Sequence, residues 1–129
     1  NEVIQLDDIN GFLIGLIDVS LNVGNKYYII DWKTNYIGPD SSYYNLDNLN
    51  LEMKQNLYNL QYLIYTLAIY RYLRNINPNF DYNKDFGGIY YLFIRGINEK
   101  NNNGIFFDKP DLEVIKRLDK IFGGNNNEL

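Results

Sequence analysis

Two charged side chains interrupt an apolar stretch of this sequence. Tyr27 to Ile30 is predicted as a buried strand, and Asp31 and Lys33 follow it on either side of Trp32. Because alternate residues of a strand point to the same face, the carboxylate and the ammonium project together, with Trp32 on the opposite face. The spacing predicts either a structural ion pair at the edge of a sheet or a reactive site. Asp-x-Lys alone is a weak signal for the reactive site.

A second carboxylate is expected beside this pair. Asp18 lies in an earlier apolar segment, Gly11 to Val23, and Gly24-Asn25 after it is typical of a hairpin turn. If the hairpin closes there, Asp18 and Asp31 lie at similar distances from the turn and near each other across the sheet. Two close carboxylates raise each other's pKa unless a cation lies between them. Mg²⁺ suits this position because it prefers hard oxygen ligands and keeps several waters.

This arrangement predicts hydrolysis of a phosphodiester bond. A metal-bound water is the expected nucleophile, and Lys33 would neutralise developing negative charge, or orient that water and help to deprotonate it. The chain has no His and no Cys, which excludes Ser-His and Cys-His nucleophilic chemistry, imidazole metal ligands and thiolate zinc sites within it. It also has no Walker-type glycine loop, which excludes an NTPase role for this chain.

The elements that must position these residues follow the order hairpin, helix, strand, helix. The returning strand, Tyr27 to Thr34, is apolar on both faces and is predicted to be central in its sheet. Residues 35–50 are expected to form a loop, and "FGGIYYLFIRG", residues 86–96, is expected to form another apolar strand. This order predicts a small α/β domain with a mixed sheet.

Two helices are predicted to flank the sheet. The first runs from Leu51 to Asn75, with apolar residues at helical spacing: Leu57, Leu60, Ile64 and Leu67. It carries Asn59, Gln61 and Arg71 and falls short of the ~20 clean apolar residues that a membrane span needs. The second opens at Pro110, has Asp111 and Glu113 in its first turn, and ends before Gly123-Gly124.

Composition indicates one soluble globular domain. The 129 residues are 46% hydrophobic and 22% charged, with a net charge of −4. A free-standing nucleic-acid binder is usually basic, so affinity for such a partner is expected to come mostly from other domains. Heavy use of Asn and Tyr is typical either of a low-complexity bias or of an AT-rich genome, and the persisting apolar periodicity favours the genome. The first residue is Asn, not Met, and we expect a piece of a longer chain.

The wider pattern resembles the PD-(D/E)xK nuclease superfamily, and within it the RecB-type nuclease domain at the C-terminus of the exodeoxyribonuclease V beta subunit. The resemblance keeps its order and spacing over nearly the whole chain. The matching stretches are G-F-x-x-G-x-I-D (11–18), Y-Y-x-x-D-x-K-x-N (27–35), G-x-D-S-S (38–42), L-Q-Y-x-x-Y-T-L-A (60–68), R-Y-L-R (71–74) and F-G-G-x-x-Y-L-F-x-R-G (86–96).

The resemblance implies a role for each matching residue. Asp18, Asp31 and the backbone carbonyl of Trp32 match the ligands of Mg²⁺, for which Mn²⁺ is an expected substitute, and Asp31 and Lys33 match the catalytic pair. Gln61 and Tyr65 match a helical Q-x-x-x-Y motif that supports the site or contacts the DNA backbone, and their spacing places them on one helix face.

Several of these residues keep a second interpretation. Tyr65 alone is also typical of core packing, because the chain has 13 Tyr. A buried amide such as Gln61 requires partners. Arg71 and Arg74 are expected to be surface charges rather than phosphate contacts, and Arg95 ends a strand and can face either way.

The sequence also departs from the family pattern. The first acidic motif of the superfamily is often Pro-Asp, whereas this chain has Ile17-Asp18, as RecB-type members also do. RecB-type nucleases resemble one another in an upstream His and in a Glu on an N-terminal helix, and Glu2 is not a convincing substitute for that Glu. We therefore expect residues 1–129 to be a single nuclease domain with a restriction-endonuclease-like core, cut from a longer helicase–nuclease without its N-terminal helix.

The implied activity is Mg²⁺-dependent exodeoxyribonuclease action on linear DNA ends and single strands during processing of double-strand breaks. The fragment alone is expected to be inactive if the His or Glu is essential. ATP would belong to the helicase part of the parent chain. Expected partners are the other subunits of a RecBCD-like complex and a recombinase, in the cytoplasm and without a membrane. The alternative is a non-catalytic module that keeps the fold and docks a recombinase or sister subunit.

Overall fold

A four-stranded sheet forms the base of the structure, a computed structural model that describes residues 20–123. The strands lie in chain order, β1 (Ser20–Val23), β2 (Lys26–Lys33), β3 (Phe86–Phe93) and β4 (Ile105–Asp108). β2 and β3 are parallel, and the two outer pairs are antiparallel. The mixed sheet and its flanking helices confirm the predicted α/β class and are consistent with a restriction-endonuclease-like core.

The hairpin between β1 and β2 closes where the sequence predicts. Val23 pairs with Lys26, and the two residues between them, Gly24 and Asn25, have φ values of 60° and 65°. Two consecutive left-handed residues define the turn whose twist matches that of the strands. Ser20 pairs with Ile29. Asp18 lies outside the described residues, so its place opposite Asp31 stays a prediction, one that requires this register to continue for two more residues.

The connection from β2 to β3 is helical, but not as predicted. Instead of a loop over residues 35–50, it holds the 3-10 helix η1 (Ser41–Tyr44) and the start of α2 (Leu46–Gln55), whose first turn is capped by the Asn45 side chain accepting from the Asn48 N–H. The single helix predicted from Leu51 to Asn75 is also wrong. The helical conformation is interrupted at Leu57, whose φ is 58°, and α3 (Tyr58–Ile76) begins after it.

The buried face of α3 differs from the predicted apolar stripe. Leu57 and Leu60 are 66% and 53% exposed, whereas Leu67 is buried. The helix instead buries one face that includes tyrosines, namely Tyr62, Thr66, Leu67, Ala68, Ile69, Tyr70 and Leu73. Tyr62 packs against aromatic residues of the sheet, meeting Tyr91 edge-on and Phe106 at a tilt, whereas Tyr70 packs edge-on against Phe80 and Tyr82. Aromatic contacts therefore accompany the burial of this helix face.

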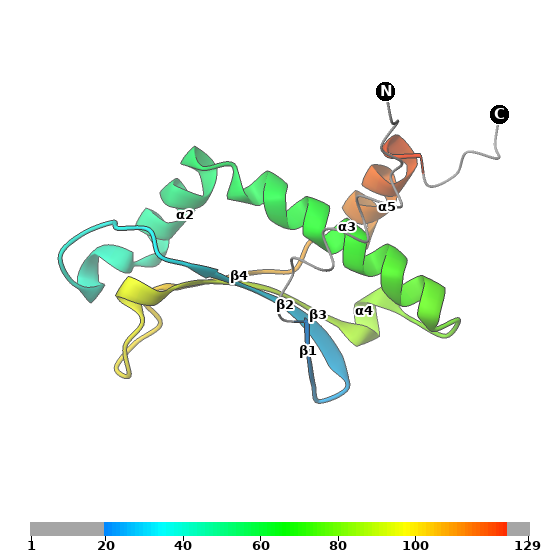
Figure 1. The fold of residues 1–129 in the computed structure, drawn as a ribbon, viewed down its shortest axis with the longest axis horizontal. Coiled ribbons are helices and arrows are strands. Elements are labelled where there is room, and N and C mark those ends of the chain that lie inside the picture. Colours follow the sequence, from blue (N-terminus) through cyan, green and yellow to red (C-terminus); the bar gives the residue numbers. More distant parts are fainter. Residues whose placement is uncertain (1–19, 124–129) are drawn as a thin grey trace, which may run out of the picture.

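The long helices cover one side of the sheet. In Figure 1, α2, α3 and α5 (Leu112–Ile121) all lie above the strands, and the core fills the space between them. Ile29 of β2 and Ile89 of β3 are buried on that side. On the other side, Trp32 is 55% exposed and Phe107 is 48% exposed. Strand β2 lies between β1 and β3 and is therefore central, as predicted, while its face away from the long helices is partly exposed at Trp32.

The end of the domain matches the sequence analysis closely. α5 begins at Leu112, two residues after the predicted start at Pro110, so Asp111 is its N-cap and not a first-turn residue. Glu113 lies in the first turn as predicted, and Gly123 follows the end of the helix with a φ of 82°. Strand β4 and the one-turn helix α4 (Tyr82–Asp85) were not predicted. None of the helices described between residues 20 and 123 is long and apolar enough to cross a membrane.

Candidate active site

Asp31 and Lys33 lie on the covered face of the sheet. In the parallel register, Asp31 pairs with Tyr91 and Lys33 with Phe93, and both aromatic residues are fully buried beneath the helices. The Lys33 Nζ atom lies 3.3 Å from Asp31 Oδ1, and the two side chains are only 16% and 17% exposed. The ion pair therefore exists, but on a central strand and not at the sheet edge. Holding two charges there is costly unless further polar groups meet them.

Gln61 supplies such a group from the first turn of α3. Lys33 Nζ donates to Gln61 Oε1 at 3.3 Å, and the Tyr91 hydroxyl donates to the same oxygen at 2.7 Å. The helix thus meets the carboxyl-terminal end of β2 through one amide oxygen with two donors. Predicted site residues that are 28 positions apart in the chain are brought together in space.

Two aromatic rings surround the Lys33 ammonium. Its Nζ atom lies 4.2 Å from the ring centroid of Tyr58 and 5.3 Å from that of Tyr91, both within the range of cation–π attraction. Tyr58 is held in turn by Asn35, whose Nδ2 donates to Tyr58 Oη at 3.0 Å and to Glu52 Oε1 of α2 at 2.9 Å. The sequence analysis missed Tyr58 and Tyr91. The position of Tyr58, one helical turn before Gln61, is the signal that marks it.

Tyr65 lies one turn after Gln61 on α3, and its role in the site stays a prediction. It packs against the core while staying partly exposed. Burial, and then the negative charge of Asp31, raise the pKa of its hydroxyl, so that it stays protonated near the carboxylate. Among the described residues, no hydrogen bond joins Tyr65 to Asp31.

The predicted arginines lie elsewhere. Arg71 Nε is 2.5 Å from Asp119 Oδ1 of α5, and Arg74 reaches the other oxygen at 3.6 Å. The Arg71 side chain is only 15% exposed, so its assignment as a surface charge is wrong, because it joins two helices. Arg74, with a side chain 52% exposed, is a surface charge as expected. Arg95 donates to the Thr34 backbone oxygen at 2.8 Å.

The electrostatics of the site favour an additional cation. Burial raises the pKa of Asp31 above its ordinary value, and the attraction of Lys33 offsets only part of this increase. Burial, together with the charge of Asp31, raises the pKa of Tyr91 as well, so that its hydroxyl remains a donor. A carboxylate that Lys33 only partly compensates is a suitable ligand for a hard metal ion.

One carboxylate among the described residues suits the predicted magnesium site. Asp31 offers a carboxylate, and the Trp32 carbonyl remains a predicted ligand. Within residues 20–123, no group of three His, Cys, Asp or Glu is placed to hold a metal ion. Mg²⁺ binds through as few as one or two carboxylates and keeps several waters, so these residues fit it if one more ligand joins them. Asp18, the predicted second carboxylate, lies outside the described residues.

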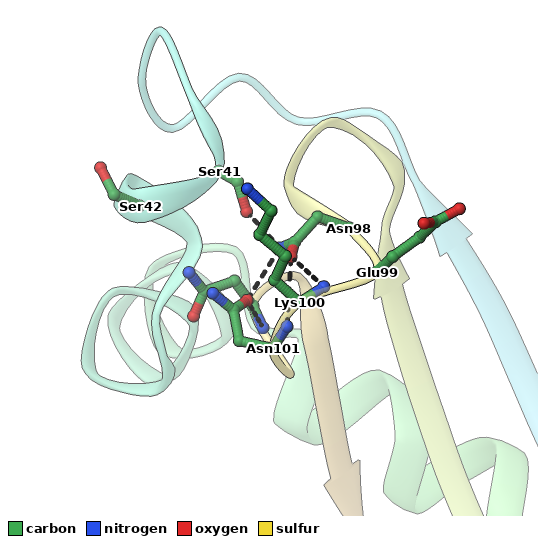
Figure 2. Close-up of a pocket in the computed structure, with 7 residues that line it drawn as sticks. Ser41, Ser42, Asn98, Glu99, Lys100 and Asn101 are labelled. Atoms are coloured by element: carbon green, nitrogen blue, oxygen red, sulfur yellow. Dashed lines mark hydrogen bonds between the residues drawn. The ribbon is translucent and has the colours of Figure 1, made fainter.

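A surface hollow lies beyond the carboxyl end of β3, away from the candidate site (Figure 2). Its volume is about 590 Å³, and Figure 2 shows Ser41, Asn98 and Asn101 linked within it by hydrogen bonds. Asn98 Nδ2 donates to Ser41 Oγ at 2.6 Å and to Asn101 Oδ1 at 2.8 Å, while Ser41 Oγ donates to the Gly96 oxygen. These groups satisfy one another and fasten the loop after β3 to η1. None of the predicted site residues lines this hollow.

Several curated proteins that are similar in sequence to this chain carry the same name. No protein-family model matches the chain. It is 43% identical over 122 residues to the RecBCD enzyme subunit RecB of Haemophilus influenzae, covering 95% of this chain and 10% of that protein. The RecB subunits of Escherichia coli and Borreliella burgdorferi are 37% and 41% identical, over 94% and 92% of this chain. The chain spans about one tenth of the length of the curated relatives that it matches.

Proposed function

Because this chain is homologous to a segment of RecB, a subunit of the RecBCD enzyme, we propose that it forms the catalytic core of a Mg²⁺-dependent deoxyribonuclease. The observation that carries the proposal is the meeting of Lys33 with both Asp31 and Gln61 on the covered face of the sheet, each at 3.3 Å. This contact joins the two motifs, Asp-x-Lys and Gln-x-x-x-Tyr, on which the resemblance to a nuclease depends.

The residues present divide the work of hydrolysis between them. Asp31, the Trp32 carbonyl and Asp18 would hold Mg²⁺, which when bound supplies an activated water and neutralises phosphate charge. Lys33 would place its ammonium near the scissile phosphate and stabilise the negative charge that grows there during attack. Gln61 fixes where that ammonium lies. Tyr65, whose hydroxyl stays protonated, would add a neutral hydrogen-bond donor at the same face.

The whole protein is proposed to act on linear DNA ends. We propose cleavage of phosphodiester bonds during processing of double-strand breaks, within a complex with further subunits of the RecBCD type. The net charge of −4 suggests that other parts of that assembly supply most of the affinity for DNA. Any ATP-dependent helicase action would likewise lie in the remainder of the parent chain.

The experiment is a comparison of DNA substrates with the natural full-length protein. We expect linear DNA to be degraded in Mg²⁺, covalently closed circular DNA to be spared, and EDTA to stop the reaction. Mn²⁺ should restore it. Failure to degrade linear DNA in either metal, by protein that still binds DNA ends, would contradict the nuclease proposal and favour the docking module.

A further inference from the structure

The amide of Gln61 has a single orientation that chemistry can assign. A lysine ammonium has donors only, so the Gln61 atom that faces Lys33 at 3.3 Å must be the amide oxygen. Tyr91 approaches the same atom at 2.7 Å and must therefore donate its hydroxyl proton to it. Both bonds disappear if the amide flips, because its nitrogen would then face two donors.

Tyr91 is the firmer of these two anchors. It is fully buried on β3, and its ring contacts those of Tyr58, Tyr62 and Phe106 with centroids 5.6, 6.1 and 6.5 Å away. The Lys33 ammonium, by contrast, lies at the end of a flexible side chain and also contacts Asp31. Of the two donors, Tyr91 is thus the one with a fixed position, and it gives the shorter hydrogen bond.

With the Gln61 amide oxygen fixed by its two donors, the position of the amide nitrogen, Nε2, is fixed as well. No described residue accepts a hydrogen bond from Gln61 Nε2. Its two N–H donors lie next to the Lys33 ammonium. Paired donors of this kind suit the non-bridging oxygens of a phosphodiester.

We propose that Tyr91 is a positioning residue, whose hydroxyl fixes the Gln61 amide so that its oxygen holds Lys33 and its N–H groups are left for the DNA-backbone contact that the Gln-x-x-x-Tyr resemblance implies. The part of this inference that concerns DNA rests on the proposed nuclease function. The holding of Lys33 does not, and it is tested without catalysis.

The first test measures the reactivity of Lys33 in the metal-free, full-length protein. Brief treatment with acetic anhydride, followed by mass spectrometry, gives acetylation of Lys33 relative to the exposed Lys100. Tyr91→Phe keeps the ring and removes only the hydroxyl. We expect it to raise Lys33 labelling roughly two- to tenfold, the range for loss of one hydrogen bond. Gln61→Leu, which also removes the amide, should raise it at least as much.

The matched control is Tyr90→Phe, the same chemical change on the next residue. Tyr90 belongs to the opposite face of β3 and packs on Tyr28 and Phe107. Labelling of Lys33 should stay at the wild-type value in this variant. Unchanged labelling in Tyr91→Phe, or an equal rise in Tyr90→Phe, would overturn the positioning role.

A double-mutant cycle then tests the link to catalysis. Tyr91→Phe should lower kcat for linear DNA in Mg²⁺ roughly tenfold in the wild-type background, the upper end of the range for loss of one neutral hydrogen bond, and have no further effect in Gln61→Leu. Independent, multiplicative losses would show that Tyr91 does not act through Gln61. If wild-type protein degrades no DNA while Lys33 labelling responds as expected, the nuclease proposal fails and the positioning of Lys33 stands.

Discussion

Lys33 at the end of β2 and Gln61 in the first turn of α3 meet at 3.3 Å, although 28 residues separate them in the chain. The contact joins the two motifs that the sequence singles out, Asp-x-Lys and Gln-x-x-x-Tyr. It also explains how a charged pair is tolerated on the covered face of a central strand. The amide oxygen and the Tyr58 ring take over part of the solvation that water would give the ammonium.

Replacing Gln61 by Glu distinguishes the role of the amide oxygen from that of the amide N–H groups. The variant keeps an acceptor for Lys33 and Tyr91 but loses the N–H donors and adds negative charge where phosphate must approach. We expect kcat for degradation of linear DNA to fall about a hundredfold, which is about 2.7 kcal/mol of transition-state stabilisation. Gln55→Glu, at the exposed end of α2, is the matched control and should keep wild-type activity. Activity within a factor of about two in Gln61→Glu would contradict a role for the amide donors.

Asp31→Asn should increase stability while abolishing activity. Because the folded pKa of Asp31 is raised above 3.8, the folded state binds a proton more readily than the unfolded state does. The cost of the buried charge is therefore absent below pH 3.8 and complete above the raised pKa. In metal-free urea unfolding of the 129-residue chain, the variant should exceed the wild type at pH 7, and its advantage should shrink as the pH falls.

The exposed residue Glu99 provides the control for that measurement. Glu99→Gln should leave the unfolding midpoint at the wild-type value across the same pH range. If Asp31→Asn is instead less stable than the wild type at pH 7, the Lys33 ion pair outweighs the cost of burial, and the direction inferred for the pKa of Asp31 is wrong.

Arg71 is predicted to act in stability and not in DNA binding. Its guanidinium contacts the Asp119 carboxylate, and it donates to the Asp119 backbone oxygen at 3.0 Å, joining α3 to α5. Arg71→Ala leaves that carboxylate, 12% exposed, with only the outlying Arg74. We expect the free energy of unfolding to fall by about 3 kcal/mol, measured by urea titration.

Arg117→Ala on the exposed surface of α5 is the control, with an expected change within about 0.5 kcal/mol. A loss of DNA affinity in Arg71→Ala without a loss of stability would assign Arg71 to phosphate contact instead.

The parts of the structure that could be predicted depend on local rules. Gly24-Asn25 indicates the hairpin because both residues tolerate positive φ, and that turn determines the strand register. The shared face of Asp31 and Lys33 follows from the period of a strand. Pro110 and the acidic residues after it mark the start of the last helix to within two residues, and Gly123 marks its end in the same way.

The parts that were missed depend on contacts distant in sequence. Leu57 adopts a left-handed conformation that nothing in its residue type favours, so the break between α2 and α3 has no local signal. Its neighbour Leu60 fits a helical stripe yet stays exposed, whereas Tyr62 of the same helix is buried against rings of the sheet. Tyr91 looks like an ordinary core residue until α3 brings Gln61 to its hydroxyl.

The most direct test of the account is the rate of linear DNA degradation in Mg²⁺ by the full-length protein and its Lys33→Ala variant. Lys100→Ala, which removes an exposed lysine outside the site, serves as the matched control. We expect Lys33→Ala to lose at least about a thousandfold in kcat, roughly 4 kcal/mol, while retaining DNA binding. The kcat of Lys100→Ala should equal that of the wild type. Undiminished degradation by folded Lys33→Ala would contradict the assignment of this site as the catalytic centre.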